Sequence, residues 1–507
     1  MDLAATLYQR ALTAPQQPAL IGTERTLSYA RLYAAASRGA HRVAAAAGSK
    51  ISEDQLPPRV GLLAFEPLHA ITGFYSLVLA GISAVVLDPA WPASRLGAVI
   101  RQLDLRHVLC DAAGAQALQQ AAVPGLMRLP IDLPEDEPES LLAPPHIDAD
   151  RELLVVFTSG TTSLPKAICR TRHSWQASVR LGSKILHASA GEISLIPGPL
   201  AHGLSLYAVV ESLTTGGTAL LTGRWMPRQV RELLESHRFT RVVAVPSILR
   251  RLLQQFDPRL LEGLRYAISG GENLPAPLRR RLQQLPGLED VVEYYGTSEH
   301  SLIAYRSTTT AQRNASTGFA GTPFPGVQLH IAAPDQETGI GEIYVHSPLL
   351  ASGYHPSGQE RFRWDGNRLS VRDMGRFTDG TLFVLGRAGG MMNLGGNNIH
   401  PSEISQAMAS ALGLAHVEVL LHEEPEAAPR LIAVIHRDEL CPTLDAQEIR
   451  ARLAAVLPTY KIPHELRCVD TWPLTSSGKI AVGRLSDVWS PEGAVLLRAP
   501  ANNTVRA

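Results

Sequence analysis

Short apolar segments rich in β-branched residues alternate along most of the chain with longer segments whose apolar residues recur at helical spacing. The alternation is plainest in "TLSYARLYAAASRGAHRVAAAA" from residue 26, "RVGLLAF" from 59, "RHVLCDAAGAQALQQAA" from 106 and "RVVAVPSILRRLLQQF" from 241. Strands and helices in this order are typical of sheets covered by helices. The pattern therefore predicts layered α/β subdomains with mainly parallel sheets.

From about residue 318 the pattern changes. Short strands punctuated by Gly and Pro, "GFAGTPFPGVQLHIAAPD" and "GIGEIYVHS", predict an antiparallel or β-barrel-like subdomain. After the glycine-rich "RAGGMMNLGGNN" comes a compact set: a helix near 401–412, strands "VEVLLH" and "LIAVIH", a helix near 445–457 and strand "ELRCVD". We predict a large N-terminal domain over 1–386, a hinge over 387–390 and a small mobile α+β domain over 391–507, because the glycines let the backbone turn freely.

One uncharged stretch, "ITGFYSLVLAGISAVVL" over 71–87, approaches the length of a membrane span. Gly81 divides it into a piece of helical length and a β-rich piece that leads into "LDP". A buried helix followed by a buried strand has this pattern. We therefore predict no membrane span.

Composition excludes several partners. Lys plus Arg and Asp plus Glu both number 47, so no overall field attracts the chain to nucleic acid or an anionic membrane. The cysteines are too sparse for a disulfide framework or a zinc cluster: Cys110, Cys169, Cys441 and Cys468. The start, "MDLAATLYQRAL", lacks the apolar region and cleavage site of a secretory signal. We expect reduced thiols and a cytoplasmic protein.

The stretch "VVFTSGTTSLPKAICR", residues 155–170, is an apolar run that breaks into small hydroxyl-bearing residues and glycine before Pro165 and Lys166. Hydroxyl and backbone N–H donors with little side-chain bulk, next to a lysine, suit a polyphosphate. The loop is not of the Walker A type, because no glycine precedes Lys166. Taken alone, these residues also fit an ordinary Ser/Thr-rich turn.

The same stretch resembles the signature loop Thr-Ser-Gly-Thr-Thr-Gly-x-Pro-Lys-Gly of the adenylate-forming superfamily, which contains acyl-CoA synthetases, peptide-synthetase adenylation domains and luciferases. Further motifs match in the superfamily's order: "PLAHGLS" at 199–205, "SGGENLP" at 269–275, "YYGTSEH" at 294–300, "VRDMGRFTDG" at 371–380, "GRAGGMMNLGGNNIHPSEI" at 386–404 and "LTSSGKI" at 474–480. The resemblance covers nearly the whole chain.

The resemblance implies an enzyme, an acid–thiol ligase that uses ATP and Mg²⁺. A carboxylic acid with a pKa near ~4 is ionised at neutral pH, so it attacks the α-phosphorus of ATP without a general base. The enzyme supplies in-line positioning and positive charge while pyrophosphate leaves, which gives an acyl-adenylate. A thiol of coenzyme A, or of phosphopantetheine on an acyl carrier protein, then expels AMP.

The resemblance also implies which residues bind the phosphates and the metal. The residues expected at the β- and γ-phosphates are Thr158, Ser159, Gly160, Thr161, Thr162 and Lys166. Thr297 or Ser298, beside Gly296, would lie near the α-phosphate, and Glu299 would bind magnesium. Without the flanking motifs, a solvated surface carboxylate would be the preferred interpretation of Glu299.

The remaining nucleotide contacts follow from the same resemblance. Adenine would be flanked by Tyr295 and by the segment Gly270, Gly271 and Glu272. Asp373 would bind the ribose hydroxyls, with Arg387 beside them, and Lys479 would bridge the carboxylate and the α-phosphate as a catalytic cation. Isolated, Asp373 fits a turn cap and the Gly-Lys turn a surface hairpin; the surrounding motifs favour the functional interpretation.

The acyl pocket is predicted in the same way. His202 of "PLAH" would gate its mouth, and Gly203 stands where amino-acid-activating relatives carry an aspartate that pairs with the α-ammonium group, which disfavours α-amino acid substrates. The other expected pocket residues are Leu204, Tyr207, Ala244, Ile268, Gly270, Tyr294, Leu302 and Ile303. A mostly apolar lining with two phenols fits an aryl or medium-length acyl group. The aliphatic members also fit an ordinary core.

Several positions depart from the superfamily's pattern. Ser163 and Ala167 replace glycines of the signature loop, Gly389, Gly390 and Asn393 replace charged hinge residues, and Asn398 replaces a common basic residue. Thioester formation is therefore less firmly predicted than adenylation. Three functions stay open: an acid–thiol ligase, an adenylating enzyme that delivers to an amine or another acceptor, and a ligand-binding pseudoenzyme.

Overall fold

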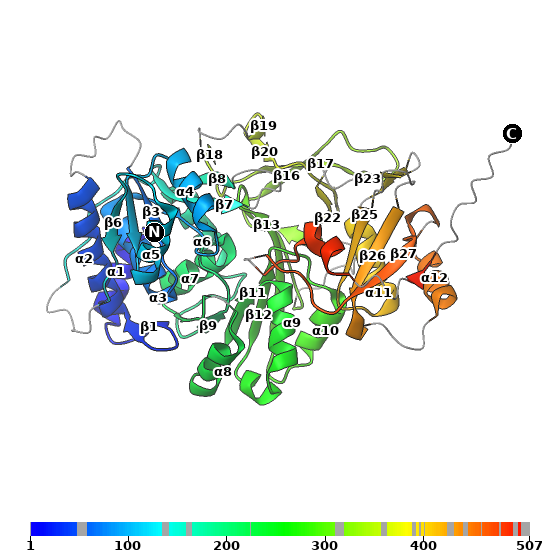
Figure 1. Cartoon of the computed structure of the whole chain (residues 1–507), viewed down its shortest axis with the longest axis horizontal. Coiled ribbons are helices and arrows are strands. Elements are labelled where there is room, and N and C mark those ends of the chain that lie inside the picture. The colour runs from blue at the N-terminus through cyan, green and yellow to red at the C-terminus, as the bar shows by residue number, and fades with distance from the viewer. Residues whose placement is uncertain are drawn as a thin grey trace.

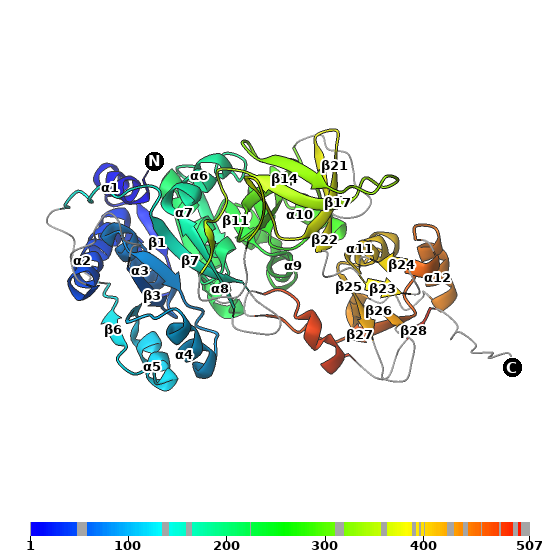
Figure 2. The ribbon, with the colours of Figure 1, turned by 90° about the horizontal axis from the view of Figure 1, so that it is seen from above.

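The computed structural model describes residues 2–47, 58–133, 141–158, 165–223, 225–309, 319–355, 362–387, 392–394, 397–399, 401–422, 430–439, 445–457, 459–475, 478–489 and 495–497. Within these residues the chain forms a large N-terminal part and a smaller C-terminal part, which lie side by side along the long axis (Figures 1 and 2). The predicted mixed α/β fold with a small C-terminal part is confirmed.

The first sheet consists of β3 (Arg59–Leu63), β4 (Ser83–Val86), β5 (His107–Cys110), β6 (Met127–Pro130), β7 (Glu152–Thr158), β8 (Lys166–Thr171) and β18 (Gly353–Tyr354). The strand order is β18-β8-β7-β4-β3-β5-β6, and β3 to β7 run parallel. The helices on this side are α3 (Pro67–Ala80), α4 (Ala93–Gln102) and α5 (Ala112–Ala121), with α1 (Leu3–Thr13) and α2 (Tyr29–Ala47) packed beside α3.

The uncharged stretch 71–87 is the predicted helix and strand. It comprises most of α3 followed by β4, and Gly81 ends the helix in the left-handed region with φ 70°. Glycine adopts this conformation without a steric penalty. No helix among the described residues is long and apolar enough to cross a membrane.

The second sheet has a parallel centre. Its strands there are β1 (Pro18–Ile21), β9 (Ile193–Ile196), β10 (Thr218–Leu221), β11 (Arg241–Ala244), β12 (Tyr266–Gly270) and β13 (Asp290–Thr297), in the order β13-β12-β11-β9-β10-β1, with β2 (Thr26–Ser28) antiparallel at the edge. The helices on this side are α6 (Arg172–Gly182), α7 (Gly203–Thr215), α8 (Pro227–Ser236), α9 (Pro246–Gln255) and α10 (Ala276–Gln283), with the 3₁₀ turn η1 (Pro258–Leu261). Fully buried, mostly apolar strands such as β10 are typical of parallel sheets covered on both faces.

The section predicted to be antiparallel extends this sheet beyond β13. It contains β14 (Ser301–Ser307), β15 (Phe319–Pro323), β16 (Gln328–Ala332), β17 (Gly341–His346), β19 (Arg363–Asp365), β20 (Arg368–Ser370), β21 (Asp373–Thr378) and β22 (Thr381–Arg387). Its strand pairs are antiparallel, and among the described strands the pairing runs as an open path from β14 to β19.

The C-terminal part has its own sheet and core. It contains β23 (Met392–Leu394), β24 (Asn397–Ile399), α11 (Pro401–Leu412), β25 (Val417–His422), β26 (Arg430–His436), α12 (Ala446–Ala454), β27 (Glu465–Val469) and β28 (Val495–Leu496), with the 3₁₀ turns η3 (Arg437–Glu439), η4 (Thr459–Lys461) and η5 (Val482–Asp487). Ile404, Met408 and Leu466 belong to a cluster separate from the N-terminal cores. The helices and strands predicted after residue 400 are present.

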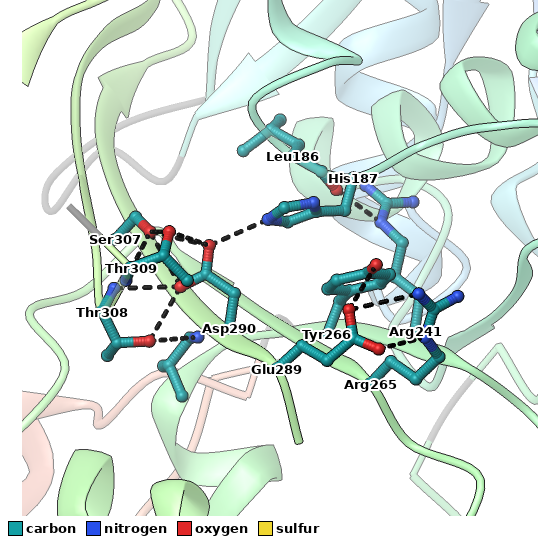
Figure 3. Close-up of polar contacts among 11 residues, drawn as sticks. Leu186, His187, Arg241, Arg265, Tyr266, Glu289, Asp290, Ser307, Thr308 and Thr309 are labelled. Atoms are coloured by element: carbon teal, nitrogen blue, oxygen red, sulfur yellow. Dashed lines mark hydrogen bonds and ion pairs between the residues drawn. The ribbon is translucent and has the colours of Figure 1, made fainter. Parts of the chain in front are cut away.

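A polar cluster surrounds Asp290, the first residue of β13 (Figure 3). Its carboxylate accepts hydrogen bonds from the Ser307 hydroxyl at 2.7 Å and from the backbone N–H and hydroxyl of Thr308 at 2.9 and 2.8 Å. His187 Nε2 lies 2.8 Å from Oδ2, and its ring stacks on Tyr266 with centroids 4.1 Å apart. Burial alone raises the pKa of Asp290, but these hydrogen bonds outweigh it and hold the pKa well below its ordinary value.

Candidate active site

A cavity of about 1220 Å³ lies between the carboxyl ends of the central strands and the turn that carries Lys479. Ala244 ends β11, Thr297 ends β13, and both line it, as does Thr158 at the end of β7 in the first sheet. Ligands of open α/β sheets bind outside the carboxyl ends of the strands. Both sheets and the C-terminal part therefore contribute to one site, in the position where a substrate is expected.

A buried carboxylate faces this cavity just beyond β13. Glu299 is 4% exposed; its Oε1 accepts a hydrogen bond from the Tyr354 hydroxyl at 2.9 Å, and its backbone oxygen accepts one from Ala351 N at 2.8 Å. Its Oε2 is buried and has no hydrogen-bond partner among the residues that the structure describes. A buried carboxylate oxygen without a partner is costly, so the site favours a cation there.

A second buried carboxylate lines the same cavity. Asp373, the first residue of β21, is 6% exposed and accepts a hydrogen bond from the Tyr295 hydroxyl through Oδ2. Both residues line the cavity. Arg387 pairs with Asp373 in the β21–β22 ladder, and its side chain lies outside the described residues.

Lys479 reaches the cavity from the C-terminal part. Its backbone closes a turn with Thr475, whose N–H donates to Lys479 O at 2.7 Å. A Cβ on Gly271 would lie 3.5 Å from Lys479 Cε and 3.7 Å from Nζ, so the lysine chain runs along this glycine, whose φ is +84°. Burial raises the pKa of the neighbouring Glu272, and the Lys479 ammonium opposes this shift.

His202 precedes the first residue of α7 and faces Asp88, which lies two residues beyond the end of β4. His202 Nε2 is 3.6 Å from Asp88 Oδ2, and both residues line the cavity. Burial lowers the pKa of His202; Asp88 raises it and Lys479 lowers it further. The imidazole is therefore held towards its neutral form.

Most of the expected acyl residues form one wall. Gly203, Leu204, Tyr207, Ala244, Tyr294 and Leu302 line the cavity. Tyr207 is anchored below it: its hydroxyl lies 3.0 Å from Ser178 O and 3.2 Å from Glu211 Oε1. Glu211 in turn forms an ion pair with Arg241, and both side chains are fully buried.

Three expected pocket residues lie outside this wall. Ile268 and Ile303 are fully buried in the main core, and Gly270 does not line the cavity. Adjacent strand residues face opposite sides, so Leu302 and Ile303 cannot both face it. A Cβ on Gly270 would come within 2.5 Å of the Tyr294 ring, which therefore covers this glycine. For Ile268 and Ile303 the core interpretation holds.

The signature loop is only partly described. Thr158 lines the cavity, whereas Ser159, Gly160, Thr161, Thr162 and Ser163 lie outside the described residues. Lys166 pairs with Thr158 across β7 and β8, and its Nζ lies 5.7 Å from the Tyr354 ring centroid. Gly296, Thr297 and Ser298 line the cavity. Gly389 and Gly390 are not described, and Asn393 pairs with Asn398 in the β23–β24 ladder.

Sequence reasoning missed several lining residues. Asp88, Arg170 and Trp175 line the cavity from the N-terminal part, and Ser402 and Gln406 line it from α11. The Oε1 atom of Gln406 is buried and meets no hydrogen-bond partner within the described ranges. Only Asp88 carried a usable signal, since an acidic residue two positions beyond a buried parallel strand lies near the ligand-binding edge.

Comparison with known proteins now identifies the class of molecule. Residues 7–355 match the family model described as "AMP-binding enzyme". The chain is 30% identical over 447 residues, 86% of its length and 88% of the relative's, to an uncharacterized acyl–CoA ligase, YhfT, of Bacillus subtilis. The chain belongs to the family of AMP-binding enzymes.

Solved structures share the fold. The o-succinylbenzoate coenzyme A synthetase MenE of Bacillus subtilis, in complex with ATP and magnesium ion, has a TM-score of 0.76 at 24% identity and covers 95% of this chain and 99% of its own. The anthranilate CoA ligase AuaEII with anthranoyl-AMP has a TM-score of 0.80 at 18% identity and covers 96% of each chain. The resemblance to the adenylate-forming superfamily is confirmed, and with it the prediction of an enzyme of the acid–thiol ligase class.

Proposed function

We propose that the enzyme converts an aryl or medium-chain carboxylic acid to its acyl-adenylate and then transfers the acyl group to a thiol. The observation that carries the proposal is the convergence of Lys479, Asp373 and the partnerless oxygen of Glu299 on one cavity. These groups come from both parts of the chain and are the ones that the superfamily's pattern assigns to the reaction. The relatives' names support the same reaction.

The residues present fit a magnesium ion. Glu299 lines the cavity and offers a buried carboxylate oxygen that lacks a partner within the described part of the chain, which suits a hard cation that prefers oxygen ligands. Magnesium is usually held by one or two carboxylates together with substrate phosphates, so a single protein carboxylate suffices. Bound there, the ion would neutralise charge on the phosphates of ATP.

The residues present also fit the nucleotide. We assign Asp373 to the ribose hydroxyls, with Tyr295 holding its carboxylate, and Gly271 and Glu272 to the adenine side. Thr158, Lys166 and the loop between them would hold the outer phosphates. Lys479 would place its positive charge beside the carboxylate and the α-phosphate, where charge develops as pyrophosphate leaves. No general base is required, because the acid is already ionised.

The acyl class follows from Gly203 and its neighbours. An α-amino acid carries an ammonium group whose unpaired burial is costly, and Gly203 provides no anion for it. Leu204, Ala244 and Leu302 give an apolar wall, and the phenols of Tyr207 and Tyr294 suit an aromatic or medium-length chain. Benzoate-like acids and hexanoate to decanoate should therefore support pyrophosphate exchange far better than any proteinogenic amino acid.

The experiment that tests this is carboxylate-dependent exchange of labelled pyrophosphate into ATP across a panel of acids, with Gly203→Asp and Gly203→Asn as matched variants. Among the described residues, no neighbouring atom lies within 4 Å of a Cβ at position 203, so either side chain starts into open space. Asp should raise kcat/KM for amino acids relative to neutral acids by about 10-fold or more, and Asn should not, because only Asp pairs with an ammonium group. A parent that prefers an amino acid, or equal effects of Asp and Asn, would contradict the proposed substrate class.

The acceptor is proposed as the thiol of coenzyme A or of a carrier-protein phosphopantetheine. Incubation of preformed acyl-AMP with coenzyme A, with a phosphopantetheinylated carrier protein and with a primary amine, followed by product analysis, separates these acceptors. Formation of an amide alone would establish the alternative of an amine-delivering adenylating enzyme. Absence of pyrophosphate exchange with every acid, despite ATP binding, would establish a ligand-binding pseudoenzyme.

We also propose that residues 391–507 form a domain that changes orientation about 387–390 between the two half-reactions. Lys479 occupies one face of the cavity, and a thiol cannot approach through that face while the lysine fills it. Hinge closure of domains around a ligand is a recurring motion in enzymes. Gly389→Pro restricts φ and should preserve one half-reaction while impairing the other; equal rates in both would contradict the hinge.

A further inference from the structure

Contacts from one face of α9 cross the boundary between the N-terminal and the C-terminal part. In the first turn of α9, the Ser247 hydroxyl donates to the backbone oxygen of Gly478, directly before Lys479, at 2.5 Å. One turn later, Arg250 donates through Nη2 to the backbone oxygen of Ala415 at 3.2 Å. Residues three apart lie on the same face of a helix, so α9 contacts the C-terminal part at two points along that face.

Ala415 lies in the short connection between α11 and β25, and both polar groups of its backbone have partners. Its N–H donates to Glu439 Oε2 at 2.7 Å, within the C-terminal part. Its carbonyl accepts the hydrogen bond from Arg250, which belongs to the N-terminal part. The connection therefore joins η3, which carries Glu439, to α9.

Arg250 carries its charge into this boundary with little exposure to solvent. It is 8% exposed, it does not line the cavity, and its Nε is buried without a hydrogen-bond partner among the described residues. Burial lowers the pKa of Arg250, whereas Glu439 and Glu272 oppose this shift. Glu272 belongs to the N-terminal part and Glu439 to the C-terminal part, so the guanidinium is compensated from both sides of the boundary.

Glu272 lines the cavity and is itself coupled to the C-terminal part. Burial raises the pKa of Glu272, and Lys479 and His416 oppose this shift. Both opposing residues belong to the C-terminal part, so the electrostatics of the cavity wall depend on where that part lies. Arg250 adds a fixed positive charge at the same boundary.

The Arg250 contact belongs to one orientation of the C-terminal part. Ala415 and Lys479 are carried by the same part, so a rotation that withdraws the lysine from the cavity also breaks the bond to Arg250. A hydrogen bond from a charged donor contributes more than one between neutral groups. A contact that is present in only one of two states shifts the equilibrium towards that state.

We propose that Arg250 is a positioning residue that selects the adenylation orientation: it holds the connection at Ala415 against α9 and thereby keeps Lys479 in the cavity. Arg250 acts through the lysine and does not itself meet the substrate. The inference rests on the proposed function and its rotating domain, and it goes further by naming the contact that sets the balance between the two orientations. Thiol transfer requires this contact to be released.

Four variants and one control test this role. Arg250→Met keeps an apolar stem but removes the donor and the charge, whereas Arg250→Lys keeps the charge beside both carboxylates. Glu439→Gln removes the acidic partner in the C-terminal part, and the double variant Arg250→Met/Glu439→Gln measures the coupling. Arg259→Met is the matched control, because Arg259 is exposed in the neighbouring turn η1 and does not line the cavity.

The experiment measures single-turnover adenylation, single-turnover thiol transfer from preformed acyl-AMP, and thermal unfolding. Arg250→Met should slow adenylation by about 10-fold or more, the scale of one hydrogen bond from a charged donor, and should not slow thiol transfer. Arg250→Lys should stay within about 3-fold of the parent, because lysine keeps the charge although it lacks the planar fork. Glu439→Gln should slow adenylation less in Arg250→Met than in the parent, because both changes remove one interaction.

Parent rates in Arg250→Met, equal slowing of both half-reactions, or a Lys variant as slow as the Met variant would overturn the proposal. A melting temperature that falls in step with the adenylation rate would assign Arg250 to stability alone and overturn it too. Failure of the proposed function is distinguishable, because the parent would then show no adenylation with any acid. Small-angle scattering with ATP and Mg²⁺ still tests the positioning role in that case: the parent should match the arrangement in Figure 2 and Arg250→Met should depart from it.

Discussion

Asp290 and Glu299 lie at the two ends of one stretch of chain, β13 and the turn that follows it, and both carboxylates are buried, at 2% and 4% exposure. Asp290 accepts hydrogen bonds from Ser307 and Thr308 and faces His187 (Figure 3). Glu299 leaves Oε2 without a partner in the described structure. The strand and its following turn therefore hold one carboxylate whose hydrogen bonds are satisfied within the fold and one that needs a ligand.

This contrast separates stability from function. A satisfied buried carboxylate stabilises the fold, since losing it leaves its donors unpaired. An unsatisfied one destabilises the empty protein and is retained where a ligand completes it. Lys479 belongs with Glu299 on the functional side of this contrast. It comes from the C-terminal part, and the turn that carries it is held mainly by hydrogen bonds within the turn.

The largest expected effect is that of Lys479→Ala. It should slow adenylation by roughly 10²–10³-fold, the scale for removing one preorganised charge at a reacting centre. Thiol transfer from preformed acyl-AMP should suffer much less. Single-turnover rates of both half-reactions measure this, with Lys461→Ala as control, since Lys461 belongs to the same part, pairs with Glu403 and does not line the cavity. Equal losses in both half-reactions would contradict a specific role of Lys479 in adenylation.

Glu299→Gln should slow adenylation by about 10²-fold and raise the Mg²⁺ concentration needed for half-maximal rate, because it removes a charged metal ligand. The free energy of unfolding in the absence of ligands should stay level or rise, since a buried charge is lost. Mg²⁺ titrations of the exchange reaction and denaturant unfolding measure the two effects. A destabilised variant with an unchanged Mg²⁺ requirement would place Glu299 with Asp290 as a structural carboxylate.

Asp290→Asn should do the reverse. It should lower the free energy of unfolding by about 1–3 kcal/mol, because the donors around it lose a charged acceptor, and leave the exchange rate unchanged. The pKa of Asp290 is lowered in the folded state, so its stabilisation is present above the unfolded-state pKa of about 3.9 and is lost as the pH falls below it. The difference in the free energy of unfolding between parent and variant should therefore be full at neutral pH and shrink towards acid pH. A gap that widens towards acid pH would contradict this sign.

The smallest effect is expected at Ser247→Ala. The Ser247 hydroxyl of α9 donates to Gly478 O at 2.5 Å and connects the N-terminal part to the turn of Lys479. Losing one such bond should reduce the adenylation rate by about 3–10-fold without slowing thiol transfer. The exposed Ser236, at the end of α8, gives a matched control in Ser236→Ala. Equal slowing of both half-reactions would show that this contact does not bias the orientation of the C-terminal part.

Much of the fold could be predicted from local pattern. Gly81 marked a helix end because few residues other than glycine adopt its backbone conformation readily, and the motif residues Thr158 and Thr297 lie at the carboxyl ends of strands, where a sheet binds ligands. These signals are encoded within a few residues. Residues of the loop after Thr158 and of the hinge lie outside the described part of the chain, so those assignments stay predictions.

The rest depends on contacts between segments far apart in the sequence. Nothing local to Arg170 indicates that its guanidinium reaches the Ser298 carbonyl, and nothing near His300 indicates Leu369 as its partner. Ile303 was expected in the pocket through its motif, although strand alternation with Leu302 already excludes it. Sequence motifs identify candidate site residues, but the pairing and alternation of strands decide which of their side chains face the cavity.

The anchored phenol beneath the acyl wall has a consequence for engineering. Tyr207 closes the wall while its hydroxyl meets Glu211, whose other oxygen pairs with the buried Arg241. Shortening Tyr207 would deepen the pocket but leave a buried acid with one contact fewer, whereas Gly203 borders open space and accepts new side chains without such a loss. Deepening the pocket at Tyr207 is therefore expected to reduce stability, whereas changing the polarity near its mouth at Gly203 is expected to leave stability largely unchanged.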